Sequence, residues 1–479
     1  MNTRMLGYLL GIILLIEAIL LLFPTAVALI YGENPLPFLG TVGILLLLSI
    51  PAILTKPKNT RIYAKDGFVC VAAAWILLSV FGALPFVFSG AIPNFISALF
   101  ETASGLTTTG ASILTEVESL PRGILFWRSF THWIGGMGVL VFMLAILPLA
   151  GGQTMHLMRA EVPGPTKGKL VPKMRRTAII LYSIYIALTL IMVIALLLCR
   201  MSLYDSVVNA LATAGTGGFS VLNSSIGGYQ NPAVEWVVAI FMVLFGINFN
   251  MYYFLLIRRW RDVLQNEELR VFLILTTMAT AAIAINTWQL FDTAGDCLRT
   301  VFFQVTTIMS TAGFATTNYD LWPSFSKTIL LILMITGSCA GSTAGGLKLS
   351  RVIILVKSTL REIRHVLRPR SVNVVRVDGE AVPDETVRSA TGYLALYLLI
   401  TVITVLLISV DGFDTETNIS AVLACINNVG PGFGAVGPTG NYSGFSLFSQ
   451  FILTINMLLG RLEIMPMFIL LTPLLRKKH

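Results

Sequence analysis

Long runs of apolar residues, interrupted by short polar segments, extend over the whole chain. The first two runs are Leu6–Ile30 and Leu36–Leu54, and comparable runs follow to the end of the sequence. A helix needs about 20 predominantly apolar residues to cross the hydrocarbon core of a bilayer. The pattern therefore predicts an all-α polytopic membrane protein that opens with two N-terminal transmembrane helices.

Beyond residue 60 the pattern repeats four times. Each unit contains a long apolar helix, a shorter helix, a loop rich in glycine and threonine, and a second long helix, at a spacing of roughly 110 residues. We divide the chain into a two-helix unit, 1–60, and four repeats, 61–170, 171–265, 266–380 and 381–479. The helices expected in the four repeats are Gly67–Phe88, Ile92–Ser104 and Gly123–Leu149; Thr177–Leu198, Leu203–Thr213 and Ala233–Ile257; Val271–Leu290, Cys297–Met309 and Lys327–Val356; and Val387–Ser409, Asn418–Ile426 and Leu447–Leu471.

The short helices have about 10–14 residues, too few to span a bilayer. We expect each of them to enter the membrane and turn back. Non-helical backbone at membrane depth is tolerated only where it is buried in protein or lines a water-filled cavity. The pattern thus predicts four pseudo-symmetric helix–pore loop–helix repeats around a central pore.

Composition narrows the class of protein. Hydrophobic residues make up 55% of the chain and charged residues only 12%, whereas a soluble domain carries about 25% charged residues. This balance excludes a soluble enzyme, a nucleic-acid binder and a secreted disulfide scaffold. The five cysteines stand singly in the sequence, so we expect neither a disulfide framework nor a transition-metal site.

The 33 lysines and arginines indicate the topology, because basic residues mark cytoplasmic loops. Their clusters predict that all repeats have one orientation, that the loops enter from outside, and that both termini are cytoplasmic. The clusters are Lys56–Lys65, Arg159–Arg176, Arg258–Arg270, Arg351–Arg388 and Arg476–Lys478, and the basic residues expected outside are Arg122, Arg128, Arg200, Arg299 and Lys327.

The loops have the composition of an ion-binding site. A cation that crosses a bilayer must have its hydration shell replaced, and a ring of backbone carbonyls does this for potassium. Glycine permits the backbone angles that such a ring needs, and threonine adds hydroxyl oxygens. For one loop an ordinary turn explains the composition equally well, but four loops at equivalent places favour a pore.

Several motifs resemble those of the Trk/Ktr/HKT superfamily of potassium transporters. The two extra N-terminal helices resemble the bacterial TrkH type more than KtrB. The motifs are Gly105-Leu106-Thr107-Thr108-Thr109-Gly110, Trp133-Ile134-Gly135-Gly136-Met137-Gly138, Ala340-Gly341-Ser342-Thr343-Ala344-Gly345-Gly346-Leu347-Lys348 and Asn427-Asn428-Val429-Gly430-Pro431-Gly432.

The resemblance implies potassium uptake across a bacterial inner membrane through a selectivity filter with one glycine per loop, with K+ as the transported ion and no bound organic cofactor. In the second loop both Gly217 and Gly218 fit, and alignment with the first loop favours Gly218. The fourth loop has asparagines in place of threonines, so we expect an asymmetric filter. The implied filter residues are Thr108, Thr109, Gly110, Thr216, Gly217, Gly218, Thr311, Ala312, Gly313, Asn428, Val429 and Gly430.

Two further features lie within apolar segments. The run Thr336–Gly346 consists mostly of small residues and does not favour a stable helix; it suits either close helix packing or a flexible segment. Arg461, expected in mid-helix, is costly in a membrane and either has a role in the pore or pairs locally with Glu463. The resemblance implies an intramembrane gating loop and a pore arginine, which correspond to Gly341, Ser342, Thr343, Gly345, Gly346, Lys348 and Arg461.

Two polar residues near the first loop have more modest expected roles. We expect Glu101 to support its loop by hydrogen bonding and His132 to be packed in the interior. The resemblance further implies a membrane homodimer and a TrkA-type cytosolic regulatory subunit that binds NAD(H) or ATP, and Arg361–Arg376 is a candidate docking segment.

Two other function classes fit the sequence less well than ion transport does. A secondary transporter with inverted repeats is disfavoured because the repeats share one orientation. An intramembrane enzyme is disfavoured because the common catalytic motifs do not occur. Symport with H+ or Na+ and passive conduction are both compatible with the sequence.

Overall fold

A computed structural model describes residues 2–55, 57, 64–146, 174–370, 373–462 and 464. Within these residues the protein is mostly helical, with one short antiparallel hairpin of β1 (Arg376–Val377) and β2 (Glu380–Ala381). The helices are α1 Thr3–Leu20, α2 Leu22–Ile30, α3 Leu36–Leu54, α4 Ala64–Gly82, α5 Leu84–Phe88, α6 Phe95–Leu106, α7 Arg122–Ile146, α9 Met174–Leu198, α10 Leu203–Gly215, α11 Pro232–Gly246, α12 Phe249–Leu256, α13 Trp260–Gln265, α14 Glu267–Thr287, α15 Ala294–Met309, α16 Ser324–Thr336, α17 Leu349–Leu367, α18 Asp384–Ile408, α19 Thr415–Ile426 and α20 Leu447–Arg461.

Some sequence predictions concern residues outside the described part of the chain. These are Glu463, most of the basic clusters Lys56–Lys65 and Arg159–Arg176, the cluster Arg476–Lys478, and the ends of the helices predicted to reach Leu149 and Leu471.

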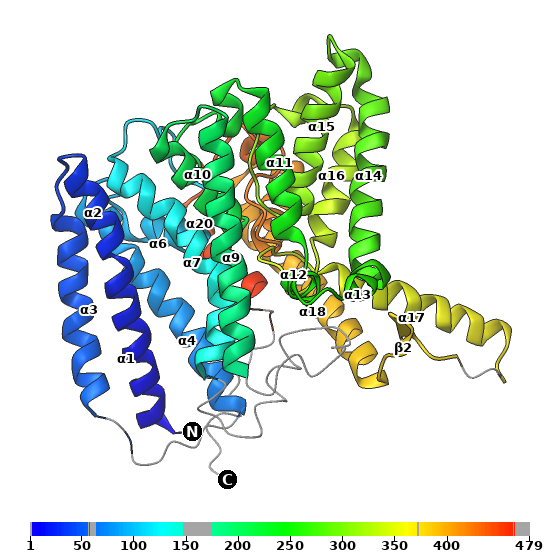
Figure 1. Cartoon of the computed structure of the whole chain (residues 1–479), viewed down its shortest axis with the longest axis horizontal. Coiled ribbons are helices and arrows are strands. Elements are labelled where there is room, and N and C mark those ends of the chain that lie inside the picture. Colours follow the sequence, from blue (N-terminus) through cyan, green and yellow to red (C-terminus); the bar gives the residue numbers. More distant parts are fainter. Residues whose placement is uncertain are drawn as a thin grey trace.

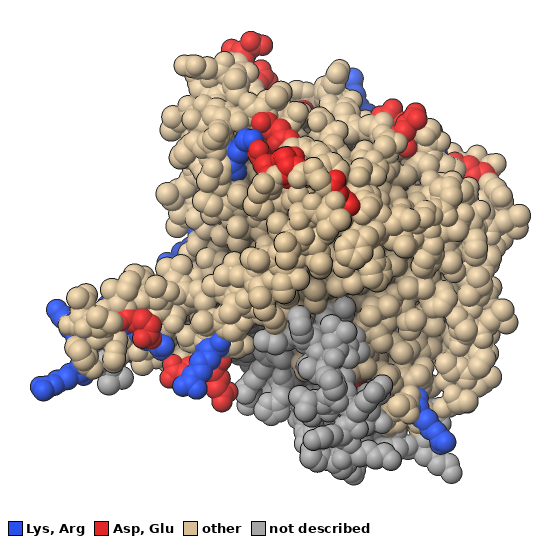
Figure 2. All heavy atoms as spheres, turned by 180° about the vertical axis from the view of Figure 1, so that it is seen from behind, with Lys and Arg blue, Asp and Glu red and all other residues tan. Residues whose placement is uncertain are grey.

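Several of the long helices are apolar enough to cross a membrane. Among the described residues, six segments are long and apolar enough to cross a membrane, or seven if α11 and α12 are counted as one bent span. The six are Thr3–Ile30, Leu36–Leu54, Asp66–Phe88, Ile179–Leu198, Glu267–Leu290 and Asp384–Asp411. A broad middle band of the surface in Figure 2 shows almost no charged side chain among the described residues, as expected where lipid covers it.

The helices form one bundle, with α1–α4 at one side and α14–α16 at the other (Figure 1). The largest buried apolar cluster includes Trp75, Phe272 and Ile308, on α4, α14 and α15. At one end of the bundle α17 projects sideways beyond the body, next to the β-hairpin. This end also carries α13 and the start of α18.

Two predicted helices are interrupted near a proline. The run Leu6–Ile30, predicted as one helix, forms α1 and α2, which meet at Leu21. Pro24 lacks the N–H that would bond to the carbonyl of Leu20, so the helical ladder is broken there. Pro85 has the same effect on the run Gly67–Phe88, which forms α4 and α5.

The second long helix of repeat 2 was predicted incorrectly. The run Ala233–Ile257 forms two helices, α11 and α12, which are bent by 89° at their junction. Ile247 is extended, and the Asn248 side chain accepts the amide of Asn250 over 2.9 Å, which starts a new helix. The bend places the junction against the broken second helix of repeat 3, where Ser338 donates to the carbonyl of Gly246.

The four short helices α6, α10, α15 and α19 share a local design. Each begins at a residue whose side chain accepts a backbone amide of the first turn, and such caps each stabilise a helix by about 1 kcal/mol. The capping residues are Asn94, Ser202, Thr293 and Asp414. Every one of these helices leads directly into a loop rich in glycine, threonine or asparagine, so the caps fix the start and the loops fix the end.

Candidate functional site

The four loops after the short helices share one backbone pattern. In each loop a residue with positive φ is followed two positions later by a glycine with positive φ. The glycines have φ between 77° and 97°, values that residues with a Cβ rarely adopt. The pairs are Thr108 (56°) with Gly110 (81°), Thr216 (57°) with Gly218 (81°), Thr311 (57°) with Gly313 (77°), and Asn428 (54°) with Gly430 (97°).

The same glycines also join the loops into a closed ring. A Cβ on any of them would overlap the backbone carbonyl oxygen that precedes the glycine of the next loop. The contacts run from Gly110 to the oxygen of Gly217, from Gly218 to that of Ala312, from Gly313 to that of Val429, and from Gly430 to that of Thr109. Four carbonyl oxygens from equivalent positions therefore lie at the junctions between neighbouring loops. Both the φ angles and the packing demand glycine at these four positions.

This geometry distinguishes the two glycines of the second loop. Gly218 has positive φ and contacts the next loop, as Gly110 does in the first loop. At Gly217, a Cβ would overlap the imidazole of His132 instead. Gly217 is therefore restricted by a side chain behind the loop, whereas Gly218 is restricted by neighbouring backbone.

The hydroxyl groups of the loops differ in their partners. Thr109 Oγ1 accepts from Asn428 Nδ2 over 3.0 Å and lies 2.7 Å from Thr107 Oγ1. Thr311 Oγ1 accepts the amide of Gly345 over 2.7 Å. Among the described residues, the buried Thr108 Oγ1 has no hydrogen-bond partner. Thr108 therefore has a hydroxyl oxygen that its surroundings leave uncommitted.

The fourth loop differs from the others through Asn428. Its Nδ2 donates to the Met457 carbonyl over 3.0 Å as well as to Thr109. Asparagine adopts positive φ more readily than most residues do, so the backbone pattern survives while the side chain ties the fourth loop to α20 and to the first loop.

A cavity of about 160 Å³ lies against all four glycines. Its other walls come from the chain that follows each glycine, including Ser112, Phe219, Ala315 and Pro431. The cavity therefore lies on the side of the ring away from the helix ends. It gives a small ion direct access to the backbone of all four loops.

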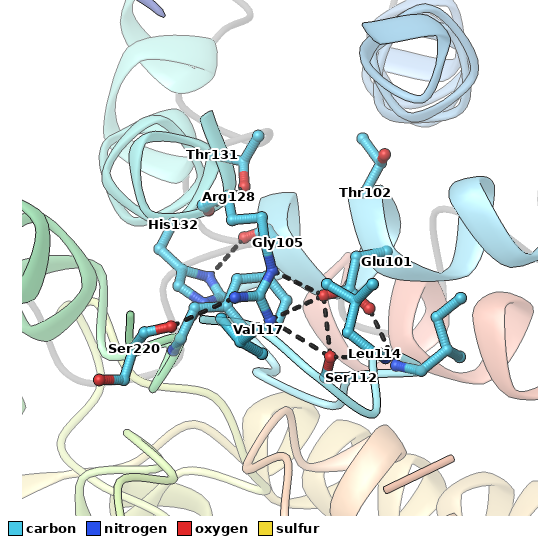
Figure 3. Close-up of polar contacts among 12 residues, drawn as sticks. Glu101, Thr102, Gly105, Ser112, Leu114, Val117, Arg128, Thr131, His132 and Ser220 are labelled. Atoms are coloured by element: carbon cyan, nitrogen blue, oxygen red, sulfur yellow. Dashed lines mark hydrogen bonds and ion pairs between the residues drawn. The ribbon is translucent and has the colours of Figure 1, made fainter. Parts of the chain in front are cut away.

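A buried ion pair supports the first and second loops from behind (Figure 3). Arg128 on α7 bonds to Glu101 on α6 over 2.8 Å, and their side chains are 3% and 0% exposed. Glu101 also accepts the hydroxyl of Ser112 and the amide of Ile113, each over 3.0 Å. Arg128 donates further to the carbonyl of Ser220 in the second loop over 3.3 Å. The pair therefore links loops that are far apart in sequence.

His132, one turn after Arg128, makes a second link between these loops. Its Nδ1 lies 2.8 Å from the carbonyl oxygen of Gly105, and its Nε2 accepts the amide of Phe219 over 3.2 Å. These partners fit a neutral imidazole that carries its proton on Nδ1. The contacts agree with a packed histidine and, for Glu101, with a supporting role behind the first loop.

Arg128 was not among the predicted site residues. It was expected only as one of the basic residues on the outer side of the membrane, but its side chain is buried inside the protein. A charge within the predicted helix Gly123–Leu149 was the signal that could have identified it, since charges in apolar segments are retained for a reason. Its acidic partner, 27 residues earlier, is visible only in the folded structure.

The segment that joins α16 to α17 packs against the ring of loops. α16 ends at Thr336 and α17 begins at Leu349, and we call the intervening residues, 337–348, the intramembrane loop. A Cβ on Gly345 would overlap the carbonyl oxygen of Asn427, immediately before the fourth ring segment. The amide of this glycine also bonds to Thr311, as described above. The intramembrane loop therefore packs directly against the third and fourth loops.

The remaining candidates of this segment occupy different parts of it. Gly341 and Gly346 have positive φ of 73° and 81°. Ser342 donates to the carbonyl of Cys339 over 2.7 Å, which makes a local turn. Lys348 donates to the carbonyl of Ala344, so its ammonium group is turned back onto the loop.

Arg461 meets the intramembrane loop from α20. The prediction of a mid-helix position was wrong, since Arg461 is the last residue of α20. Its guanidinium donates to the carbonyls of Thr343 over 2.8 Å and Gly135 over 2.9 Å. Arg461 is 8% exposed, and neither of these partners is a carboxylate. The arginine therefore connects α7, α20 and the intramembrane loop.

Comparisons with known proteins agree over nearly the whole chain. The profile of a family described as "TrkH: Cation transport protein" matches residues 38–477. The chain is 35% identical to the Trk system potassium uptake protein TrkH of Salmonella typhimurium, with 99% of each chain covered. It is 34% identical to the Trk system potassium uptake protein TrkG of Escherichia coli, with 98% of each covered. These relatives are named as transport proteins and not as enzymes.

The fold is similar to that of a solved transporter. The crystal structure of the potassium transporter TrkH from Vibrio parahaemolyticus matches this structure with a TM-score of 0.89 and 31% sequence identity. The match covers 100% of both chains.

Proposed function

This chain belongs to the TrkH family of cation transport proteins, and we propose that it takes up K+ through the ring formed by its four glycine loops. The observation that carries the proposal is the closed series of glycine–carbonyl contacts. Carbonyl oxygens replace the hydration shell of K+ in known filters. We therefore assign the selectivity filter to the residues around Gly110, Gly218, Gly313 and Gly430.

The short helices favour a cation at the same place. α6, α10, α15 and α19 all lead with their C-terminal ends into the loops. Each helix C-terminus has a partial charge of about −0.5, so four of them lower the energy of a cation that has lost water. We propose that residues 61–170, 171–265, 266–380 and 381–479 act as four repeats around this pore, with the N-terminal unit, 1–60, packed on its outside.

The gate is proposed to lie beneath the filter. The intramembrane loop contacts two of the four filter loops, through Thr311 and Asn427. Arg461 adds a guanidinium beside this loop, and a fixed positive charge raises the energy of a passing cation. We propose that the loop closes the pore mechanically and that Arg461 opposes K+ electrostatically.

The charge distribution supports an orientation in a bacterial inner membrane. The exposed segment Glu362–Arg370, at the end of α17, contains Arg364, Arg368 and Arg370. Basic segments prefer the cytoplasmic side. We propose that α17 and the β-hairpin face the cytoplasm, that both termini lie there as well, and that the four loops enter from outside.

The relatives belong to a Trk system with several components. We propose that a TrkA-type cytosolic subunit, which binds NAD(H) or ATP, docks on the exposed end of α17. We also propose that two copies of this chain form a homodimer in the membrane, as the resemblance to the Trk/Ktr/HKT superfamily implies.

The filter assignment is tested by Gly110→Ser. The purified chain is reconstituted in liposomes, and uptake of ⁸⁶Rb+ and ²²Na+ is compared for the parent and the variant. We expect lower Rb+/Na+ discrimination, because the new Cβ overlaps the carbonyl of Gly217. Gly412→Ser is the matched control: Gly412 also has positive φ, at 76°, but an added Cβ there would meet no atom within 4 Å. Unchanged selectivity in Gly110→Ser, or an equal loss in Gly412→Ser, would contradict the assignment.

A further inference from the structure

A single carboxylate accepts hydrogen bonds from two backbone amides, one inside the intramembrane loop and one just after it. Glu268 stands at the start of α14 and is 7% exposed. Its Oε1 accepts the amide of Ala340 over 2.7 Å and the amide of Ser350 over 3.0 Å. These two amides lie ten positions apart and flank Gly341–Leu349. Hydrogen bonds to a buried carboxylate are about twice as strong as those between neutral groups.

A backbone hydrogen bond also joins the beginning of the intramembrane loop to the residue that follows it, close to Glu268. The amide of Leu349 donates to the carbonyl of Ser338 over 2.9 Å, so the two strands of the neck lie side by side. Glu268 therefore contacts the neck of the loop, while the tip of the loop reaches Thr311 and Asn427 of the filter. Any large displacement of the tip has to bend or open this neck.

The β-hairpin and α17 hold the first turn of α14, and therefore Glu268, in position. The amide of the preceding residue, Glu267, donates to Asp378 in the turn of the β-hairpin over 2.7 Å. The side chain of Asn266 donates to the same carboxylate over 3.1 Å. Lys357 on α17 pairs with Glu267 over 2.5 Å and donates to the carbonyl of Arg376 over 2.7 Å. The first turn of α14 is thus bound to both the hairpin and α17.

We propose that Glu268 is a positioning residue that latches the intramembrane loop in its closed place, and that the hairpin holds this latch. The inference rests on the proposed function of the loop as a gate. It adds the group that sets the equilibrium between the closed and open positions of the loop. Removing the carboxylate leaves two buried amides without their acceptor, which favours states in which the neck opens to water. The latch acts on the gate alone and does not touch the four filter glycines.

Flux through reconstituted protein tests the latch. We expect Glu268→Ala to raise ⁸⁶Rb+ flux in the absence of any partner by roughly tenfold or more, because the loss of one hydrogen bond to a charged group typically brings a factor of that size and this variant loses two. Glu268→Asp keeps the charge but withdraws the oxygen by one methylene, so it should raise flux as well. Glu268→Gln keeps an acceptor oxygen in place and should change flux least. All three variants should retain the parental Rb+/Na+ selectivity.

The matched control is Glu235→Ala. Glu235 is 8% exposed and stands in the first turn of α11, but it pairs with Arg299 and makes no hydrogen bond to the intramembrane loop. We expect it to leave flux unchanged. Parental flux in both Glu268→Ala and Glu268→Asp, or an equal rise in Glu235→Ala, would overturn the latch. If Glu268→Ala does not fold, Glu268→Asp decides alone.

A second readout reports the loop itself. Ser342→Cys places a thiol in the loop, and the rate at which a water-soluble methanethiosulfonate changes flux is compared with and without Glu268→Asp. The parent, with its native cysteines, is the blank. We expect faster modification when the latch is withdrawn, and equal rates would overturn the proposal. A chain that conducts no Rb+ at all, with or without Gly110→Ser, would instead contradict the proposed function.

Discussion

Arg461 donates a hydrogen bond to the carbonyl oxygen of Thr343 over 2.8 Å, across 118 positions of sequence. The contact brings the last described helix against the intramembrane loop of repeat 3. A second bond to Gly135 completes the anchorage. Because both partners are neutral carbonyls, the positive charge of the guanidinium is left uncompensated by these contacts.

Replacement of Arg461 should therefore open the pore. We expect Arg461→Ala to raise basal ⁸⁶Rb+ flux by roughly tenfold, which corresponds to a barrier lower by about 1.4 kcal/mol. The reason is twofold: the variant removes a positive charge near the proposed ion path and releases one contact of the loop. The measurement is uptake into proteoliposomes at matched protein content.

Arg461→Lys separates the two contributions. It retains the charge but cannot reach two carbonyls in the fork geometry of arginine. Flux near the parental value in this variant assigns the barrier to charge, and flux near that of Arg461→Ala assigns it to anchorage. Arg461→Ala with parental or lower flux in well-folded protein would remove Arg461 from the gate.

The two glycines of the second loop are restricted by different neighbours, although alanine should be harmful at both. Gly217→Ala forces a methyl group into the ring of His132, and Gly218→Ala forces one into the backbone of Ala312. Overpacking typically costs about 1–3 kcal/mol. We expect both variants to lower the thermal midpoint and the Rb+/Na+ selectivity.

His132→Ala provides the test of this difference. It removes the ring that Gly217→Ala would strike, so the second substitution should cost much less in that background, as a double-mutant cycle would reveal. Gly218→Ala should cost the same in both backgrounds, since its obstacle is backbone. Equal coupling of His132 to both glycines would contradict the register given above.

The sequence was informative about which residues line the loops and much less so about what surrounds them. The four short helices are recognisable because each combines a capping residue, an apolar stretch and a glycine-containing loop, and the helix starts differ from prediction by up to three residues, as at α19. The equivalence of Gly110 and Gly218 follows from aligning the loops. Which carbonyl oxygen each glycine contacts depends on how the four loops are arranged around the ring. This arrangement cannot be read from any local sequence pattern.

Helix breaks and buried ion pairs were harder to predict. Asn248 is one polar residue in a long apolar run, and its role as a cap depends on the nearby loop that fills the 89° bend. A supporting role for Glu101 could be predicted from the sequence, but its pairing with Arg128 is visible only once α6 and α7 pack together. Glu268 lies in the first turn of an apolar helix, a common place for an acidic residue, so nothing local distinguishes it from any other helix-terminal charge.

The Arg128–Glu101 pair should be important for both stability and selectivity. Removing one partner of a buried ion pair typically costs about 3–5 kcal/mol, because the other charge is left without compensation. We expect Arg128→Met to lower the thermal midpoint and to reduce Rb+/Na+ selectivity, since the first and second loops lose their shared support. Unfolding followed by tryptophan fluorescence and dual-isotope uptake measure the two effects.

Two further variants make this prediction specific. The double variant Arg128→Met/Glu101→Gln leaves no unpaired charge and should be more stable than Arg128→Met alone. Arg299→Gln breaks the partly exposed pair with Glu235, away from the loops, and should leave selectivity unchanged. If selectivity in Arg128→Met equals that of the parent, the pair serves only the fold.

The exposed end of α17 is where we expect the cytosolic subunit to bind. Arg364, Arg368 and Arg370 lie within a fully exposed stretch that projects from the bundle (Figure 1). Charge complementarity at such a rim mainly raises the association rate and falls with added salt. We expect the triple reversal to glutamate to weaken capture of the cognate TrkA-type subunit in a pull-down at low salt. Arg200→Glu, an exposed arginine just after the end of α9 at the opposite end of the molecule, is the control. Binding that is equal in the parent, the control and the triple variant would exclude this docking site, whereas a loss confined to the triple variant would place the regulatory subunit next to the hairpin that holds Glu268.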